Sequence, residues 1–184
     1  MTWAIWITGL PGSGKSVIAG RVRNILTGRG IAVEVLELDE IRKFITPQPS
    51  YSEEEREVVY ASLVYMAKLL VASGKPVIID ATANRRRYRE RARESITNFA
   101  EVYVKCSLGT CMERERSRKA KHAPSGIYNK AKTAGAPVPG VNVPYEEPEY
   151  PELVVDSDKM SVDGCAENVV AFIIKYQQNI KMPT

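Results

Sequence analysis

Short apolar runs alternate along this 184-residue chain with longer segments of helical periodicity. The runs are rich in Ile and Val, residues that favour pleated strands. They predict strands at residues 4–8, 31–38, 77–80, 102–106 and 153–156. Between and after them, apolar residues recur every three or four positions, and this pattern predicts helices at residues 15–27, 52–73, 85–97, 110–118 and 161–178.

Strands that alternate with helices are typical of βαβ units, whose right-handed crossovers build a parallel sheet. The expected fold class is therefore α/β, with a parallel sheet of about five strands flanked by helices. A length of 184 residues fits a single domain over residues 1–184 that can bury its own core.

One segment, at about residues 119–151, breaks this rhythm with six prolines and three glycines. A linker between two domains is one explanation, but too little chain follows to form a second domain. Long irregular segments within compact domains are usually lids or binding loops. We therefore interpret residues 119–151 as a lid that covers a substrate.

Composition is ordinary for a globular protein, with 44% hydrophobic and 26% charged residues. The net charge of +4 fits either an anionic substrate or a lysine-rich surface. Three widely spaced cysteines, without a C-x-x-C pair and with a single histidine, indicate reduced thiols. No apolar run reaches the roughly 20 residues of a membrane helix. A strand-like segment occupies the place of a signal peptide, so we expect a cytoplasmic protein.

The turn after the first predicted strand carries the motif G-x-x-x-x-G-K-S and leads into a predicted helix, the context that supports a phosphate-binding loop of the P-loop NTPase type. Its glycines let backbone N–H groups face phosphates. Lys15 is expected to reach the β- and γ-phosphates, and the Ser16 hydroxyl to coordinate Mg²⁺. The chain has no N-K-x-D motif for reading guanine, which favours ATP. The predicted ATP-binding residues are Gly9, Leu10, Pro11, Gly12, Ser13, Gly14, Lys15 and Ser16.

Candidate residues for the acceptor follow the second and third predicted strands, at the sheet edge where open parallel sheets bind ligands. Asp39 could orient or deprotonate an attacking hydroxyl, and its alternative role is the N-cap of a helix that starts at Glu40. Arg42 and Arg56 are candidates for binding an anionic group. Asp80 fits a second carboxylate near Mg²⁺ and a turn residue equally well.

The arginine-rich run at residues 85–91 has two interpretations. Such a run can form an RNA-binding stripe. Its interspersed glutamate and helical spacing fit a solvent-facing surface better, although one or two of its arginines could point at phosphates. We therefore do not expect a nucleic-acid partner.

Several motifs, in one order along almost the whole chain, resemble the adenylylsulfate kinase (APS kinase) family. Residues 139–153, PGVNVPYEEPEYPEL, resemble the family's T-G-I-D-S-P-Y-E-x-P-x-x-P-E-L, and residues 126–131, GIYNKA, resemble its G-L-Y-K-K-A. Residues 38–42 parallel its G-D-N-V-R, and residues 51–56 its F-S-E-x-D-R. The resemblance implies ATP-dependent phosphorylation of the 3′-hydroxyl of adenosine 5′-phosphosulfate (APS) to 3′-phosphoadenylyl sulfate (PAPS), with release of ADP, in sulfate assimilation.

The resemblance also implies roles for single residues. Asp39 takes the place of the family's carboxylate near Mg²⁺ and the 3′-hydroxyl. Arg42 and Arg56 fall on positions that hold the phosphosulfate end, and Tyr51 on an aromatic that stacks on the adenine. Thr82 and Ala83 would make backbone contacts to the substrate. The implied catalytic residues are Lys15 and Asp39, the metal ligands Ser16 and Asp39, and the substrate-binding residues Asp39, Arg42, Tyr51, Arg56, Thr82, Ala83, Lys130 and Val138.

Four positions depart from the family's pattern. Val138 replaces the second aromatic of the adenine sandwich, and Val59 replaces an asparagine that makes a polar contact. Ala83 stands where some members carry a phosphorylated serine. The lysine before the G-L-Y element appears as Ser125, and its charge could be replaced by Lys121, Lys130 or Lys132.

Two other functions stay open. Another small P-loop kinase, acting on a nucleoside, sugar or RNA end, would share Asp39 but would have no reason to carry the P-Y-E-E-P element at residues 144–148. A non-catalytic nucleotide- or RNA-binding module would leave Asp39 without a role. The expected partners are the small molecules ATP and APS, with Mg²⁺ as cofactor and without a membrane or nucleic acid; a homodimer is left open.

Overall fold

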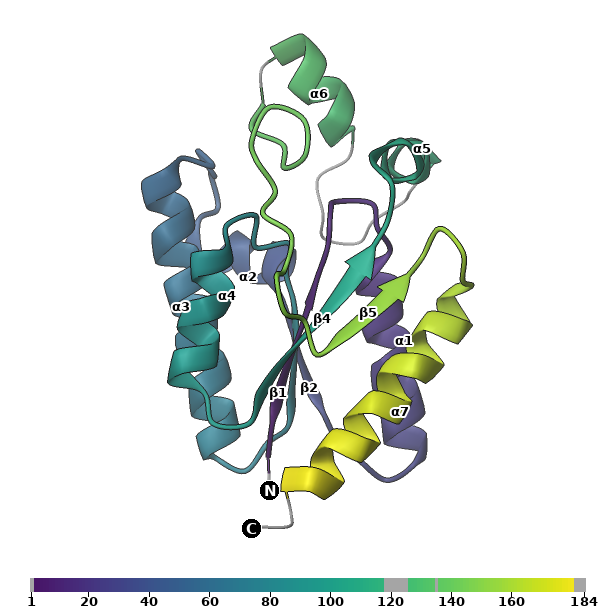
Figure 1. Cartoon of the computed structure of the whole chain (residues 1–184). Helices are drawn as coiled ribbons and strands as arrows, with labels where there is room; N and C mark the ends of the chain where they lie inside the picture. The colour runs from purple at the N-terminus through teal and green to yellow at the C-terminus, as the bar shows by residue number, and fades with distance from the viewer. Residues whose placement is uncertain (1, 118–125, 135, 181–184) are drawn as a thin grey trace.

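A computed structural model describes residues 2–117, 126–134 and 136–180 of the chain. Its five strands form one sheet in the order β2-β3-β1-β4-β5, and every neighbouring pair is parallel. The expected α/β fold with a five-stranded parallel sheet is confirmed (Figure 1). The strands are β1 (Ala4–Thr8), β2 (Glu34–Glu37), β3 (Val77–Asp80), β4 (Phe99–Lys105) and β5 (Leu153–Asp156).

Helices cover both faces of this sheet (Figure 1). One face packs against α1 (Lys15–Gly28) and α7 (Val162–Ile180), the other against α3 (Glu53–Ala72) and α4 (Arg86–Ser95). The short helices α2 (Leu38–Ile45), α5 (Leu108–Ser117) and α6 (Ile127–Ala134) follow at or beyond the carboxyl ends of the strands. Among the described residues, no helix is both long and apolar enough to cross a membrane.

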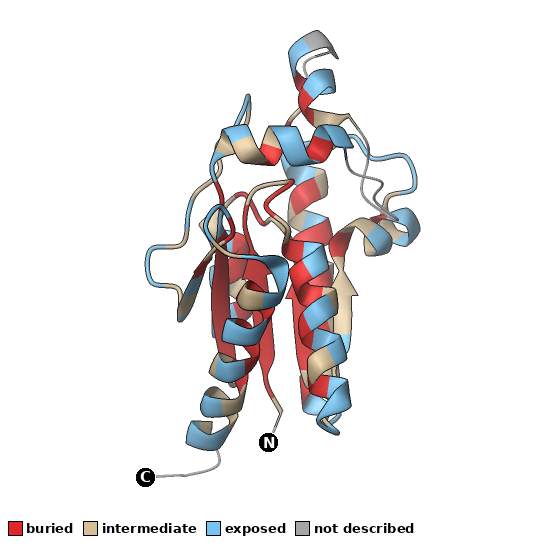
Figure 2. Cartoon of the chain, turned by 90° about the vertical axis from the view of Figure 1, so that its right-hand side faces the viewer, coloured by how far each residue is buried: buried red, intermediate tan, exposed pale blue. Residues whose placement is uncertain are grey.

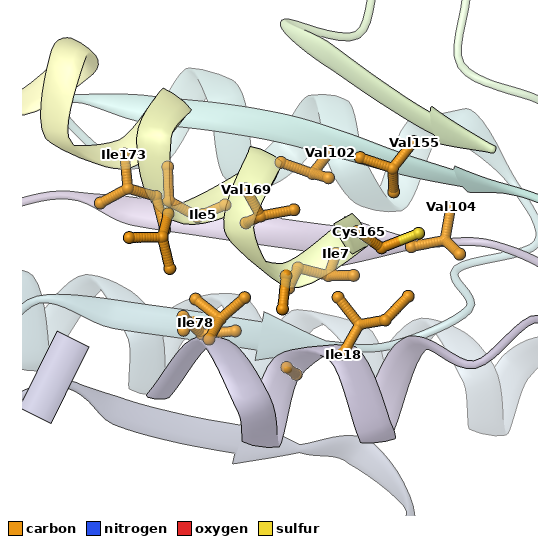
Figure 3. Packing of buried hydrophobic residues seen from close by; sticks show 14 of the residues in the cluster. Ile5, Ile7, Ile18, Ile78, Val102, Val104, Val155, Cys165, Val169 and Ile173 are labelled. Carbon is orange, nitrogen blue, oxygen red and sulfur yellow. The ribbon is translucent and has the colours of Figure 1, made fainter. Parts of the chain in front are cut away.

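The central strand β1 shows why the sheet needs both helical layers, because all five of its residues are buried (Figure 2). Ile5 and Ile7 face the α1–α7 layer and belong to one apolar cluster with Ile18 of α1 (Figure 3). Ala4 and Trp6 belong to the cluster on the opposite face. Removing this apolar surface from water is the main force that holds the three layers together.

Two expected boundaries are wrong at the end of the sheet that carries the ligand-binding candidates. The second strand ends at Glu37 instead of continuing to residue 38, because α2 begins at Leu38 with Glu37 as its N-cap. Asp39 therefore lies inside the first turn of α2 and is not the N-cap of a helix that starts at Glu40. Its carboxylate is not used for capping, so the alternative role considered for Asp39 is excluded.

The proline- and glycine-rich segment 119–151 is not irregular throughout, since it contains α6. Residues 127–134 lack proline and glycine, and Tyr128 and Ala131 pack against Cys111 of α5 in a small apolar cluster. The high proline content of the flanks concealed this short helix. Residues 119–125 and 135 of the same segment lie outside the described part of the chain.

Candidate functional site

The phosphate-binding loop connects β1 to α1 and contains two glycines that its backbone requires. Gly12 and Gly14 have φ values of 83° and 97°, in the left-handed region that favours glycine. A Cβ atom on Gly12 would also collide with the backbone of Cys111. Gly14 is the N-cap of α1 and supplies no side chain to cap the helix. The first N–H groups of α1 can therefore bind an anion.

The two side chains that follow these glycines differ in exposure. Lys15 is buried, and its Nζ atom lies 3.4 Å from the carbonyl oxygen of Leu10, across the loop. Ser16 is exposed. Both residues, with Pro11, line one cavity of about 300 Å³. An ammonium group and a hydroxyl group are thus presented to the same space.

The same cavity is lined by two carboxylates, Asp39 in the first turn of α2 and Asp80 at the end of β3. Glu37 of β2 pairs in register with Asp80 of β3, and Asp39 follows two residues after Glu37. The two carboxylates and the Ser16 hydroxyl are oxygen donors, the ligand type that Mg²⁺ prefers. Among the described residues, no group of three or more His, Cys, Asp or Glu side chains could hold a metal ion. Mg²⁺ beside a nucleotide needs only one or two carboxylates together with phosphates, so this donor set fits the ion.

Arg42, Tyr51 and Arg56, which we call the acceptor group, line the cavity as well. The Tyr51 ring centroid lies 5.1 Å from the guanidinium carbon of Arg42 and 5.8 Å from that of Arg56. Both guanidinium groups are largely buried. Burial raises the pKa of Tyr51 above its usual value, so its phenol stays neutral at physiological pH. The group combines two cations with an aromatic face.

Arg56 is held by three hydrogen bonds, two of them to distant parts of the chain. Its Nε donates to the Tyr51 carbonyl at 3.0 Å, and its Nη2 to the Pro137 carbonyl at 3.1 Å. Its Nη1 donates to Oδ1 of Asn84 at 3.4 Å. None of these partners carries a charge, so the positive charge of Arg56 is not neutralised by them.

The remaining predicted substrate-binding residues divide into two sets. Thr82, Lys130 and Val138 line the cavity. Ala83 is buried, and its amide donates to the Tyr60 hydroxyl at 2.9 Å while its carbonyl accepts from Arg89. The structure therefore does not bring the backbone groups of Ala83 into the cavity.

Of the positions that depart from the family's pattern, Val59 is explained by its surroundings. Val59 is fully buried in the apolar cluster of α3 and α4, where a polar side chain would be unfavourable. Ser125 and Lys121 lie outside the described residues.

Sequence reasoning missed Tyr60 and Pro137, which also line the cavity. Tyr60 was detectable in principle, because it lies four residues after Arg56 on the same face of α3. Pro137 could not be found this way, since only the tertiary fold brings its carbonyl to Arg56.

The arginine-rich run forms ion pairs instead of a stripe of unneutralised charge. Arg87 is exposed and pairs with Glu53 and Glu57, as expected for a solvent-facing surface. Arg89 differs, because its side chain is 2% exposed and pairs with Glu101 of β4. Part of the run is therefore an internal link between α4 and the sheet, which offers no support for an RNA-binding surface.

Comparison with known proteins agrees with this geometry. The family model described as adenylylsulphate kinase matches residues 1–156. A probable adenylyl-sulfate kinase of Bacillus subtilis is 37% identical over 172 residues, covering 92% of this chain and 83% of the relative. One of Archaeoglobus fulgidus is 38% identical over 160 residues, covering 86% and 98%.

A solved structure shows the same fold. The Mycobacterium tuberculosis APS kinase in complex with AMPPNP and APS superposes with a TM-score of 0.83 at 29% identity, covering 94% of this chain and 98% of that one. Family model, relatives and fold coincide over the segments that build the cavity. This chain belongs to the adenylylsulfate kinase family.

Proposed function

We propose that the chain transfers the γ-phosphoryl group of ATP to the 3′-hydroxyl of APS inside the cavity described above, forming PAPS and ADP. One observation carries this assignment of the site: Lys15 and Ser16 of the phosphate-binding loop line the same cavity as the acceptor group. A kinase must hold two ligands with the phosphate of one facing the hydroxyl of the other. The M. tuberculosis relative was solved with an ATP analogue and APS together, which supports this arrangement.

In this mechanism the 3′-oxygen of APS attacks the γ-phosphorus, and the bond from that phosphorus to the β–γ bridging oxygen breaks as ADP leaves. Asp39 orients the 3′-hydroxyl and accepts its proton. Lys15 and the N–H groups at the start of α1 stabilise the negative charge on the transferring phosphoryl group. Ser16 and Asp39 would hold Mg²⁺, which when bound would supply further positive charge beside the phosphates.

The acceptor group would recognise the two ends of APS separately. Arg42 and Arg56 bind the phosphosulfate, since guanidinium groups suit planar arrays of anionic oxygens. Tyr51 stacks on the adenine, and Val138 gives the base an aliphatic contact. Lys130 and the backbone at Thr82 complete the substrate site. We propose that residues 119–151 act as a lid whose closure excludes water from the phosphoryl group.

A reducing compartment suits this protein. Cys106, Cys111 and Cys165 are all buried thiols without a disulfide. Persistent free thiols are typical of the cytoplasm, where we place the reaction.

The test is a coupled assay that measures release of ADP from ATP and Mg²⁺ with APS as acceptor. We expect saturable turnover that depends on APS, and little turnover on an unmodified nucleoside or a sugar. ADP release with a nucleoside or sugar, and none with APS, would instead support the other small-kinase function. Omitting Mg²⁺ in the presence of a chelator should abolish turnover.

A further inference from the structure

The start of α3 differs from the capping box that its S-x-x-E pattern predicts. Ser52 is the N-cap, and its Oγ accepts a hydrogen bond from the Glu55 amide at 3.1 Å, which is the first half of the box. In the second half, the glutamate carboxylate should accept from the Ser52 amide. That amide donates to Ser50 Oγ at 3.2 Å instead. The Glu55 carboxylate is therefore directed elsewhere.

Both carboxylate oxygens of Glu55 contact residues around the substrate cavity. Oε1 accepts from Nη1 of Arg42 at 2.7 Å. Oε2 accepts from the Ser50 amide, from Ser50 Oγ at 2.7 Å and from the Tyr51 amide at 3.3 Å. Burial raises the pKa of Glu55, but the hydrogen bonds from Ser50 and Arg42 outweigh it and hold that pKa below its usual value. Glu55 is thus ionised at physiological pH.

The backbone conformation of Tyr51 explains why the hydrogen bonds from its neighbours are needed. Its φ is 56°, a conformation that a bulky side chain rarely adopts. Strained residues of this kind persist only where several contacts hold them. Here the Tyr51 amide donates to Glu55, and its carbonyl accepts from Arg56. Tyr51 is therefore held between two consecutive residues of α3.

From these contacts we infer that Glu55 is a positioning residue for APS, which fixes Arg42 through Oε1 and the Ser50–Tyr51 turn through Oε2. Glu55 is not among the residues that line the cavity, so it acts through the two that are. The Arg42 guanidinium and the Tyr51 ring are thereby ordered before substrate binds, which reduces the entropy lost on binding. This inference rests on the proposed function, because it concerns the APS end of the same site.

The test compares Glu55→Gln with Glu54→Gln in the ADP-release assay. Both changes remove one negative charge from the first turn of α3, but Glu54 is exposed and does not contact Arg42 or Tyr51 in the structure. An amide NH₂ group in place of one Glu55 oxygen would face N–H donors on either side. We expect Glu55→Gln to raise KM for APS about tenfold or more, with KM for ATP within about twofold of wild type. Glu54→Gln should change neither constant.

Two further variants check the mechanism of this effect. Glu55→Asp keeps the charge and should recover part of the affinity for APS. Ser50→Ala removes one exposed partner of Oε2 without disturbing the core and should give a smaller rise in KM for APS. In a double-mutant cycle, Arg42→Gln and Glu55→Gln should be less than additive, because each removes the same contact.

The possible outcomes distinguish a failure of the proposed function from a failure of the role inferred for Glu55. If the wild type shows no APS-dependent release of ADP, the proposed function fails and the role of Glu55 with it. If the wild type turns over APS normally but a folded Glu55→Gln variant keeps its KM for APS, only the role of Glu55 is refuted. Equal rises in KM for APS and ATP, or the same rise in Glu54→Gln, would likewise refute a role of Glu55 that is specific to APS. Should Glu55→Gln fail to fold, an unchanged KM for APS in Ser50→Ala would overturn the inference.

Discussion

The phosphate-binding loop and the acceptor group lie on one cavity, yet they are built from different kinds of contact. The loop is eight consecutive residues, and its main chain takes part in the hydrogen bonds that hold it. The Ser13 amide donates to the Leu10 carbonyl at 3.0 Å. The Pro11 and Ser13 carbonyls accept from the hydroxyls of Tyr128 and Ser157. The acceptor group comes from α2, from the turn before α3 and from α3 itself. Side chains join it to distant segments, as when Arg56 reaches Pro137, 81 positions along the chain.

The acceptor group is the more adaptable of the two regions. A loop defined by positive φ values tolerates few substitutions, because any Cβ at Gly12 or Gly14 would be strained. A group joined by side-chain hydrogen bonds can change its ligand when one residue changes. In the proposed function, the loop holds the phosphates of ATP and the acceptor group selects the acceptor that meets them.

The largest effect is expected for Asp39→Asn, which leaves the phosphate-binding loop intact. This change removes the proposed proton acceptor while keeping the side-chain volume. We expect kcat to fall by about 10²–10⁴-fold, the usual contribution of a general base. KM for ATP should change little, because Lys15 and the loop remain. A variant with near-wild-type kcat would remove Asp39 from the chemistry.

Lys15→Ala changes the phosphate-binding loop and leaves the acceptor group intact. Loss of its ammonium group should lower kcat by about 10²–10³-fold, as for other electrostatic donors at a transition state. Binding of APS, measured by calorimetry, should be retained because the acceptor group is untouched. Lys68→Ala, an exposed lysine of α3, serves as the control. Parallel losses of APS binding and kcat in Lys15→Ala would show that the two regions are not independent.

Arg56→Lys probes whether the acceptor group depends on hydrogen bonds as well as charge. Lysine keeps the cation but cannot reproduce three divergent hydrogen bonds, so the Pro137 carbonyl and Asn84 lose a donor. We expect KM for APS to rise about 10–100-fold and the free energy of unfolding to fall by about 1–3 kcal/mol. Steady-state kinetics and urea unfolding measure the two effects. If stability falls while KM for APS is unchanged, Arg56 is a structural link and not a substrate ligand.

The smallest expected effect is the pH dependence of stability at Glu55. Its folded-state pKa is lowered below the ordinary value of 4.5, so its contribution is complete above that pH and is lost as pH falls through the lower folded value. Wild type should therefore melt at a higher temperature than Glu55→Gln at neutral pH, and the difference should shrink in acid below about pH 4. Thermal unfolding by circular dichroism measures it. A difference that is constant with pH would mean that ionisation of Glu55 does not stabilise the fold.

Individual strands and helices show which parts of the structure could be predicted from the sequence. Strands β1, β3 and β5 were predicted at their observed bounds, because short apolar runs between turns have few other conformations available. Asp39 was predicted at the right sheet edge, and only the alternative role considered for it, the N-cap of a helix that starts at Glu40, was wrong, because α2 starts at Leu38. The predicted helix at residues 52–73 begins within one residue of α3, but the contact between Glu55 and Arg42 was found only in the structure.

By itself the sequence determined the phosphate-binding loop, the parallel sheet and the family, because these depend on local backbone rules, on periodicity and on motifs that are contiguous in the chain. Only the tertiary structure decided that Tyr60 and Pro137 belong to the cavity, that Ala83 does not, and that Glu55 clamps Arg42 and Tyr51. The hydrogen bonds that side chains make to other segments depend on direction and distance in space. No spacing along the chain encodes those quantities for segments as far apart as α3 and Pro137.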